Sequence, residues 1–209
     1  MQLPDDIHFY QLRYELQEVA RWGSYLSTEE VERRGLMKAE SRKQSFLLGR
    51  AALRSLLGEL TGAAPAAIEL KVLDDGRVVA PKTPYHVSIA HSGDRAVAIA
   101  SKRRVGVDIE QIVEKPEALL RFVLHKDEIE HVNSLPVPNN KRLFLCWTLK
   151  EAVLKAIGTG LLRSPKTVKL EISYDLGRAN VKEDEGFLWE VRFEQQEDYM
   201  LAVAVEPAE

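Results

Sequence analysis

Residues 95–111, RAVAIASKRRVGVDIEQ, contain two predicted strands and the polar link between them. On both sides of the link, larger apolar residues alternate with small or polar residues, which is the period-two pattern of a strand. The link itself, residues 101–106, lies near the middle of the 209-residue chain. It therefore predicts a crossover between an N-terminal and a C-terminal part.

Similar elements occur on the two sides of this link. Helical spacing of apolar residues predicts long helices over residues 46–60 and 140–160, each of which is followed or closed by glycine. Alternating apolar residues predict strands, which lie at residues 85–90, 96–101, 104–110, 187–193 and 199–206. Most neighbouring strands are joined by short turns, so we expect an antiparallel-rich sheet.

Two short similarities suggest that the two parts are related. AALR at 51–54 resembles AVLK at 152–155, and AVAIA at 96–100 resembles LAVAV at 201–205. Both pairs are offset by about one hundred residues, as expected for a repeated unit. Chance similarity between ordinary amphipathic elements is the alternative explanation.

The repeat predicts an α+β fold that is a pseudo-dimer of two similar halves, residues 1–102 and 103–209. Each half is expected to pack one long helix on an antiparallel-rich sheet. With 209 residues, of which 45% are hydrophobic, the chain can bury cores of the required size.

Composition excludes several classes of protein. The formal net charge of −3 gives no overall attraction to nucleic acid or to an anionic membrane surface. No apolar run approaches membrane-spanning length, and the start MQLPDDIHFY has no signal-peptide features, so we expect a cytoplasmic protein. Cys146 is the single cysteine, which excludes an internal disulfide, and its apolar neighbours predict a buried, unreactive thiol.

Two acidic residues share one face of the strand at 104–110. Side chains in a strand alternate, so Gly106, Asp108 and Glu110 point to the face opposite the valines and the isoleucine. The Cβ atoms of the two acids should lie about 6.5 to 7 Å apart, which allows one divalent cation to bridge the carboxylates. A solvated outer face of an edge strand is the alternative.

A third acid lies on the helix predicted over 140–160. Trp147, Glu151 and Lys155 follow each other at i, i+4 and i+8, so they form one stripe. An ordinary surface pair of glutamate and lysine would have the same spacing. The tryptophan favours a stripe that is at least partly covered.

Basic residues that could meet phosphate occur in three places. His91 belongs to HSGD, a predicted turn between two strands, although an isolated surface histidine is the alternative. Arg77 follows a second predicted turn. A third group precedes the first long helix, and we expect most of its members to cover a helix surface: Arg33, Arg34, Lys38, Arg42 and Lys43.

The order of these motifs resembles the 4′-phosphopantetheinyl transferase superfamily. The specific pair is VGVDIE, of the form [V/I]GxDxE, followed about forty residues later by WTLKEAVLK, of the form W[S/T]xKE[A/S]xxK. The resemblance covers most of residues 30–165. A length of about 200 residues is similar to the Sfp type rather than to the half-length, trimeric acyl-carrier-protein synthase type.

The resemblance implies a set of residue roles. Asp108, Glu110 and Glu151 would hold Mg2+ against the diphosphate of coenzyme A, which places the metal site in the C-terminal half. Asp108, Glu151 and Lys155 would form the catalytic group, with Glu151 as the base for a serine hydroxyl. Lys155 would also lie near the phosphates and the leaving group.

Further residues are implied to bind coenzyme A, which this family holds between its two halves. Arg77 and His91 match positions that contact its phosphates, and Arg33 is a weaker match. Ala90 stands where many members have serine, so it can offer only its backbone. GRVVAP at Arg77 replaces the commoner GKP, which keeps the charge and loses the proline.

The implied function is Mg2+-dependent transfer of the 4′-phosphopantetheine arm of coenzyme A to a serine of an apo acyl or peptidyl carrier protein, with release of 3′,5′-ADP. A monomer with no nucleic-acid or membrane partner is expected, because the cleft would lie within one chain. A metal-dependent diphosphate hydrolase and a non-catalytic coenzyme A-binding module are the alternatives. The sequence leaves open which carrier is used, whether Mg2+ or Mn2+ works better, and which acyl-coenzyme A forms are accepted.

Overall fold

A computed structural model of the chain describes residues 1–159, 162–183 and 186–208. Contacts divide it into an N-terminal unit, Asp5–Lys102, and a C-terminal unit, Met1–Pro4 with Arg103–Glu209. The first four residues therefore belong with the C-terminal unit and not with the predicted N-terminal half. One reason is that the amino group of Met1 pairs with the carboxylate of Glu194.

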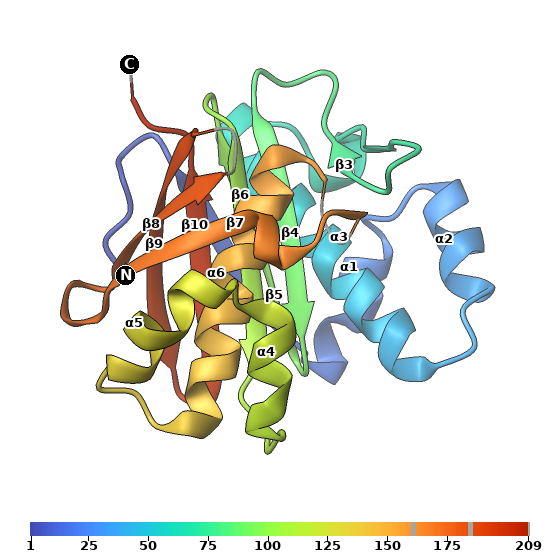
Figure 1. Ribbon diagram of the computed structural model, residues 1–209. Coiled ribbons are helices and arrows are strands. Elements are labelled where there is room, and N and C mark those ends of the chain that lie inside the picture. The colour runs from blue at the N-terminus through green and yellow to red at the C-terminus, as the bar shows by residue number, and fades with distance from the viewer. Residues whose placement is uncertain (160–161, 184–185, 209) are drawn as a thin grey trace. The chain divides into compact units, whose positions relative to one another are not determined.

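The N-terminal unit packs one long helix on a three-stranded sheet (Figure 1). Its main elements are β1 (His8–Arg13), α3 (Glu40–Thr61), β4 (His86–Ser92) and β5 (Arg95–Ser101). The strand order is β1-β5-β4, and both pairs are antiparallel. The shorter elements are η1 (Leu16–Glu18), α1 (Val19–Gly23), α2 (Thr28–Gly35), η2 (Pro65–Ala67), β2 (Lys71–Val72) and β3 (Val78–Val79).

Helix α3 contains the predicted helix at 46–60 and begins six residues earlier. Its apolar stripe is buried, with Leu48, Ala52 and Leu56 all at most 3% exposed. The helix ends at Thr61 and is capped by Gly62, whose φ of 73° is a left-handed conformation that glycine adopts without steric cost. The predicted stop signal is thus confirmed.

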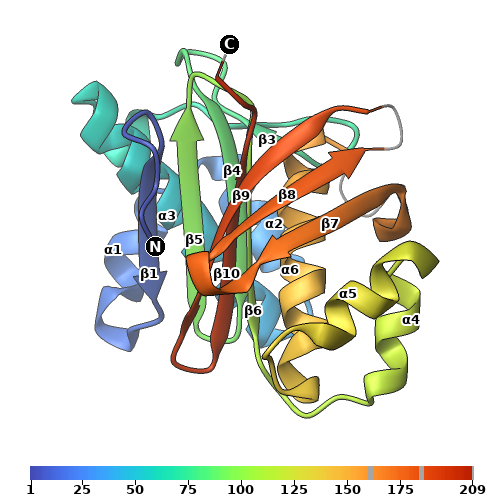
Figure 2. The same cartoon turned by 60° about the vertical axis from the view of Figure 1, so that its left-hand side comes forward.

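The C-terminal unit packs a second long helix on a five-stranded sheet (Figure 2). Its main elements are β6 (Val105–Gln111), α6 (Asn139–Ile157), β9 (Leu188–Gln196) and β10 (Tyr199–Val205). The strand order is β6-β10-β9-β8-β7, and every pair is antiparallel. The remaining elements are η3 (Glu117–Leu119), α4 (Leu120–Val123), η4 (Lys126–Glu128), α5 (Ile129–Ser134), η6 (Pro165–Thr167), β7 (Val168–Ser173), η7 (Tyr174–Leu176) and β8 (Arg178–Glu183).

Both units share one order of elements. In each unit a strand and a long helix precede a hairpin, and the last strand of the hairpin pairs with the first strand of the unit: β1-β5-β4 and β6-β10-β9. The predicted α+β fold with antiparallel-rich sheets is confirmed, and the recurring order matches the predicted repeat. Among the longer strands, β1, β7 and β8 were not predicted, although VKLEIS of β7 has clear alternation.

Helix α6 lies directly on β6. A Cβ atom at Gly106 would lie 2.5 Å from the backbone nitrogen of Ala156 and closer still to the carbonyl oxygen of Ala152. Only glycine therefore permits this approach. The helix ends at Gly158, whose φ is 92°, whereas Gly160, the last residue of the predicted helix, lies outside the described residues.

No helix in residues 1–159, 162–183 or 186–208 combines the length and the apolar character that a membrane span requires.

Candidate active site

Asp108 and Glu110 lie on the face of β6 that α6 covers. They share this face with Gly106, on which α6 rests. Asp108 is 5% exposed and Glu110 is half-buried. The alternative of a solvated outer strand face is therefore wrong for Asp108.

Helix α6 turns its predicted stripe toward these two acids. The Nζ atom of Lys155 donates a hydrogen bond to Oδ1 of Asp108 at 2.7 Å. The indole Nε1 of Trp147 donates to Oε1 of Glu110 at 3.2 Å. Lys155 thus donates to an acid on β6, so the stripe lies against the sheet. Glu151 and Lys155 are therefore not an ordinary solvated surface pair.

Burial dominates the electrostatics of the two innermost carboxyl groups. Burial raises the pKa of Asp108 to about 6, against the lowering effect of Lys155, and the charge of Glu110 raises it further. Burial also raises the pKa of Glu151 to about 7, with additional raising by Asp108 and Glu110. The three carboxyl groups are therefore close enough for charge on the others to disfavour ionisation of Asp108 and Glu151.

Two carboxylate oxygens at this position lack a hydrogen-bond donor. Oδ2 of Asp108 and Oε1 of Glu151 are both buried and have no partner among the described residues. A buried, unpaired carboxylate oxygen is unfavourable unless a cation or a proton donor meets it. Oxygen ligands of this kind suit a hard divalent cation, so the donor set fits Mg2+.

The three predicted metal ligands do not contribute equally. In the part of the chain that the structure describes, no group of three or more histidine, cysteine, aspartate or glutamate side chains is arranged as a ready metal site. Lys155 occupies one oxygen of Asp108, and Trp147 occupies one oxygen of Glu110. Asp108 and Glu151 therefore provide the better-fitting oxygens, and metal binding by all three acids stays a prediction.

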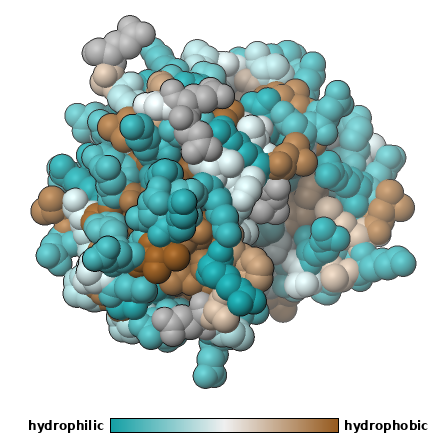
Figure 3. Space-filling view, in the orientation of Figure 1, coloured by the Kyte–Doolittle hydropathy of each residue, from teal (hydrophilic) through white to brown (hydrophobic). Residues whose placement is uncertain are grey.

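An apolar groove adjoins Glu110 in the C-terminal unit. Its volume is about 340 Å3, and its lining consists of Glu110, Lys115, Leu119, Phe122, Val123, Leu143, Phe144 and Trp147. Figure 3 shows hydrophobic side chains gathered on the surface in the region of α4 and α5. Sequence patterns did not predict this groove, because its walls come from β6, the segment after it and separate helical segments, which meet only in the folded chain.

A second candidate site is a cavity of about 700 Å3 in the N-terminal unit. We call it the basic pocket, and its lining residues are Arg33, Leu36, Met37, Lys38, Ala39, Ser41, Arg42, Ser45, Phe46 and His91. They come from the end of α2, the start of α3, the segment between them, and β4. The structure thus brings together Arg33 and His91, which lie far apart in the sequence.

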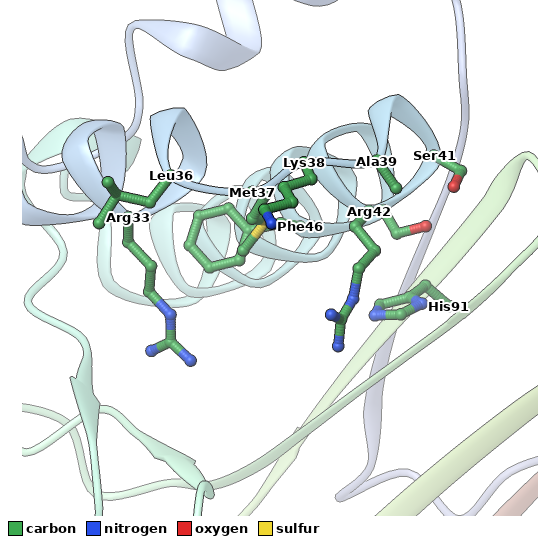
Figure 4. A pocket seen from close by; sticks show the side chains of 10 residues that line it. Arg33, Leu36, Met37, Lys38, Ala39, Ser41, Arg42, Phe46 and His91 are labelled. Atoms are coloured by element: carbon green, nitrogen blue, oxygen red, sulfur yellow. The ribbon is translucent and has the colours of Figure 1, made fainter.

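The cations of the basic pocket are held at its wall (Figure 4). The guanidinium carbon of Arg33 lies 5.9 Å from the centre of the Phe46 ring, within the range of a cation–π contact. Arg42 lies beside His91 in Figure 4. Most of the basic residues of this segment were expected to cover a helix surface; Lys38 and Arg42 are exposed and also line the pocket.

Helix α2 is anchored to α3 by one carboxylate. Glu30 forms the capping box of α2 with Ser27, and its oxygens pair with Arg50 at 2.8 Å and Arg54 at 2.8 Å. These pairs are almost fully buried, so they hold α2 in place more firmly than exposed pairs would. Arg33, on the last turn of α2, is positioned as a result.

Two predicted coenzyme A contacts are not brought into the basic pocket. Arg77 lies on the turn between β2 and β3, where its Nε and Nη2 atoms pair with Asp75 at 2.8 and 2.7 Å. Ala90 is 3% exposed and points to the opposite side of β4 from His91. His91 is also a residue of β4 itself and not of the turn that was predicted to contain it.

Comparisons with known proteins agree with the motifs. Residues 104–204 match the family described as the 4′-phosphopantetheinyl transferase superfamily. The chain is 27% identical to the 4′-phosphopantetheinyl transferase HetI of Nostoc sp. over 174 residues, which is 77% of this chain and 72% of HetI. It is 32% identical to a phosphopantetheinyl transferase of Thraustochytrium sp. over 160 residues, which is 68% of this chain and only 56% of that protein.

Among solved structures, holo-[acyl-carrier-protein] synthase of Thermotoga maritima is similar, with a TM-score of 0.42 and 24% identity. The match covers 50% of this chain and 63% of that one. The family model and the curated relatives confirm the recognition made from VGVDIE and WTLKEAVLK and the enzyme class that it implied. The chain belongs to the 4′-phosphopantetheinyl transferase superfamily.

Proposed function

We propose that the chain transfers the 4′-phosphopantetheine arm of coenzyme A to a serine hydroxyl of an apo carrier protein, in an Mg2+-dependent reaction that releases 3′,5′-ADP. One observation carries this proposal: Asp108 and Glu151 are buried together, each with one carboxylate oxygen that has no donor among the described residues. Both residues are at the acidic positions of the two family motifs.

Mg2+ fits these residues because it prefers oxygen ligands and commonly takes only a few carboxylates. Asp108 and Glu151 would hold it, with Glu110 as a further ligand after release from Trp147. When bound, the ion would neutralise charge on the diphosphate of coenzyme A.

Glu151 is suited to accept the proton of the attacking serine. Burial raises its pKa to about 7 without a bound cation, and its carboxylate oxygen that does not contact the cation would take the proton. The serine oxygen forms a bond to the phosphorus that carries the pantetheine arm, while the bond from that phosphorus to the oxygen of 3′,5′-ADP breaks. Lys155, which is 28% exposed at its side chain, can donate a hydrogen bond to the leaving oxygen.

The basic pocket suits the phosphates of coenzyme A. Arg33, Lys38, Arg42 and His91 supply donors at its wall, and the pocket includes the start of α3, where the helix dipole favours an anion. The 3′-phosphate is the group we assign to this pocket. Because Arg77 already pairs with Asp75, we give it no part in this contact.

The apolar groove beside Glu110 suits the methyl and methylene groups of the uncharged pantetheine arm, because apolar walls favour apolar groups. A carrier protein as partner, a cytoplasmic location and a monomeric state complete the proposal. These three features come from the family resemblance and the composition.

Mass spectrometry tests the proposal. The chain is incubated with coenzyme A and Mg2+, with and without each of several apo-carrier proteins. We expect a carrier heavier by one phosphopantetheine and release of 3′,5′-ADP only when the carrier is present. Release of 3′,5′-ADP without carrier would instead indicate a hydrolase, and binding of coenzyme A without any product would indicate a binding module.

A further inference from the structure

A buried ion pair lies on α6 next to the candidate active site. Lys150 immediately precedes Glu151, and its side chain is fully buried. Its Nζ atom donates to Oε2 of Glu128 at 2.6 Å. Lys150 is part of the WTLKEA motif, yet none of the roles described above uses it.

Glu128 links three elements of the C-terminal unit. Its Oε2 atom also accepts a hydrogen bond from the backbone nitrogen of His125 at 2.6 Å, at the start of η4. Its Oε1 atom accepts from the backbone nitrogen of Leu170 at 2.7 Å, on the edge strand β7. Both carboxylate oxygens are therefore satisfied, and Lys150 joins α6 to this connection.

We propose that Lys150 is a positioning residue whose ion pair with Glu128 fixes the rotation of α6 about its own axis, which sets where Glu151 and Lys155 point. This inference rests on the proposed function. Successive helical residues are separated by about 100°, so fixing the direction of Lys150 also fixes that of Glu151 and, one turn later, of Lys155.

Several contacts hold α6 in the C-terminal unit, among them its buried apolar side chains and the hydrogen bonds of Trp147 and Lys155 to β6. The close approach at Gly106 sets the distance of the helix from β6 but involves only small residues, Ala152 and Ala156. Small side chains allow a helix to rotate without steric collision. A charged group buried at a single point does not, because rotation would separate Lys150 from Glu128 without water to replace the bond.

Direct contact of Lys150 with substrate does not agree with its position. Its side chain has no exposed surface, and its ammonium group is directed to Glu128. Lys155 differs in both respects, because it is partly exposed and reaches Asp108. The two lysines of the motif therefore have different environments although they are five residues apart.

The test compares the parent with Lys150→Met, Glu128→Gln and the double variant that carries both substitutions, and adds one control. Removing Lys150 alone leaves Glu128 buried without a counter-charge, and we expect a large fall in Tm. The double variant removes both charges while glutamine keeps an acceptor oxygen for a backbone N–H, so its Tm should recover toward that of the parent. Lys169→Met is the matched control, because it removes an exposed pair between β7 and η4.

Steady-state kinetics and Mg2+ binding are measured well below the lowest Tm. We expect the double variant to show a kcat lower by roughly ten- to a hundredfold, as small displacements of catalytic groups do, with KM for coenzyme A within about threefold. Calorimetry should show Mg2+ binding weakened by roughly tenfold, since Glu151 would be displaced. Lys169→Met should leave kcat, KM for coenzyme A and Mg2+ affinity unchanged.

A double variant with recovered Tm, parental kcat and parental Mg2+ affinity would overturn the inference and leave the ion pair with a stabilising role only. If the double variant does not fold, Glu128→Gln is used, because it keeps Lys150, and unchanged kcat and Mg2+ affinity in that variant would overturn the inference equally. Absence of transfer by the parent would count against the proposed function, whereas the Mg2+ titration still tests positioning.

Discussion

Replacing Glu151 by glutamine should stabilise the protein at alkaline pH although it removes a carboxyl group from the candidate active site. In the folded protein Glu151 has a pKa of about 7, because burial and the charges of Asp108 and Glu110 disfavour its ionised form. In the unfolded chain its pKa is near the ordinary value of 4.5. The contribution of protonated Glu151 to the free energy of unfolding is therefore fully present below pH 4.5 and is lost as the pH rises through 7.

The size of the effect follows from the two pKa values. A difference of about 2.5 units corresponds to about 3 kcal/mol of lost stability once the group is ionised in both states, near pH 8. The glutamine side chain in E151Q has no charge and therefore avoids this loss, although burying its amide without a partner costs about 1 kcal/mol. We expect E151Q to exceed the parent by about 2 kcal/mol at pH 8 and to be equal or slightly less stable at pH 4.5.

Urea denaturation followed by circular dichroism, in EDTA at pH 4.5, 6 and 8, measures this difference. Glu171→Gln is the control, because it makes the same substitution at an exposed position of β7 in the same unit, where the side chain is not buried. A difference between E151Q and the parent that is the same at all three pH values would refute the reasoning. Loss of phosphopantetheine transfer by E151Q, in the same preparations, tests its assigned role as base.

Three further changes test other parts of the site. Gly106→Ala should destabilise the protein by at least about 3 kcal/mol in chemical denaturation, because the new methyl group would collide with Ala152 of α6. If this variant is as stable as the parent, α6 does not rest on β6. Arg42→Ala should raise KM for coenzyme A by roughly tenfold, and Arg77→Ala should not, so equal effects would contradict the assignment of the phosphate to the basic pocket. Mg2+ at about 100 times its Kd should stabilise the parent by about 2.7 kcal/mol at pH 8. At pH 5 the stabilisation should be much smaller, because Asp108 is then largely protonated. Thermal melting measures both, and equal stabilisation at pH 5 and pH 8 would argue against Mg2+ binding by Asp108.

Much of the fold could be predicted from local patterns. The helices at 46–60 and 140–160 and five strands follow from periodicity, because burial of one face imposes that periodicity on the sequence. The recurrence of helix, strand, turn and strand also indicated two similar halves. The edge strand β7 and its neighbour β8 were missed, since neither has a partner element in the N-terminal unit that would have pointed to it.

Prediction of the basic residues was less successful for a physical reason. Charge and turn propensity identify residues that could bind phosphate, but not the residues with which they already pair. Arg77 pairs with its neighbour Asp75, whereas Arg42 lines a pocket with His91 from a strand far along the chain. The pairing of Arg77 is local, but the position of Arg42 beside His91 depends on tertiary placement, so no local pattern showed that Arg42 lines a pocket.

The sequence by itself determined which side chains share a face: Asp108 with Glu110 on a strand, and Trp147 with Glu151 and Lys155 on a helix, because backbone geometry sets periods of two and 3.6 residues. Only the tertiary structure decided that these two faces meet, through the missing side chain of Gly106. That contact removes water from the carboxyl groups. Their raised pKa values, and with them the proposed affinity for a cation, result from burial, which is a property of packing and not of sequence spacing.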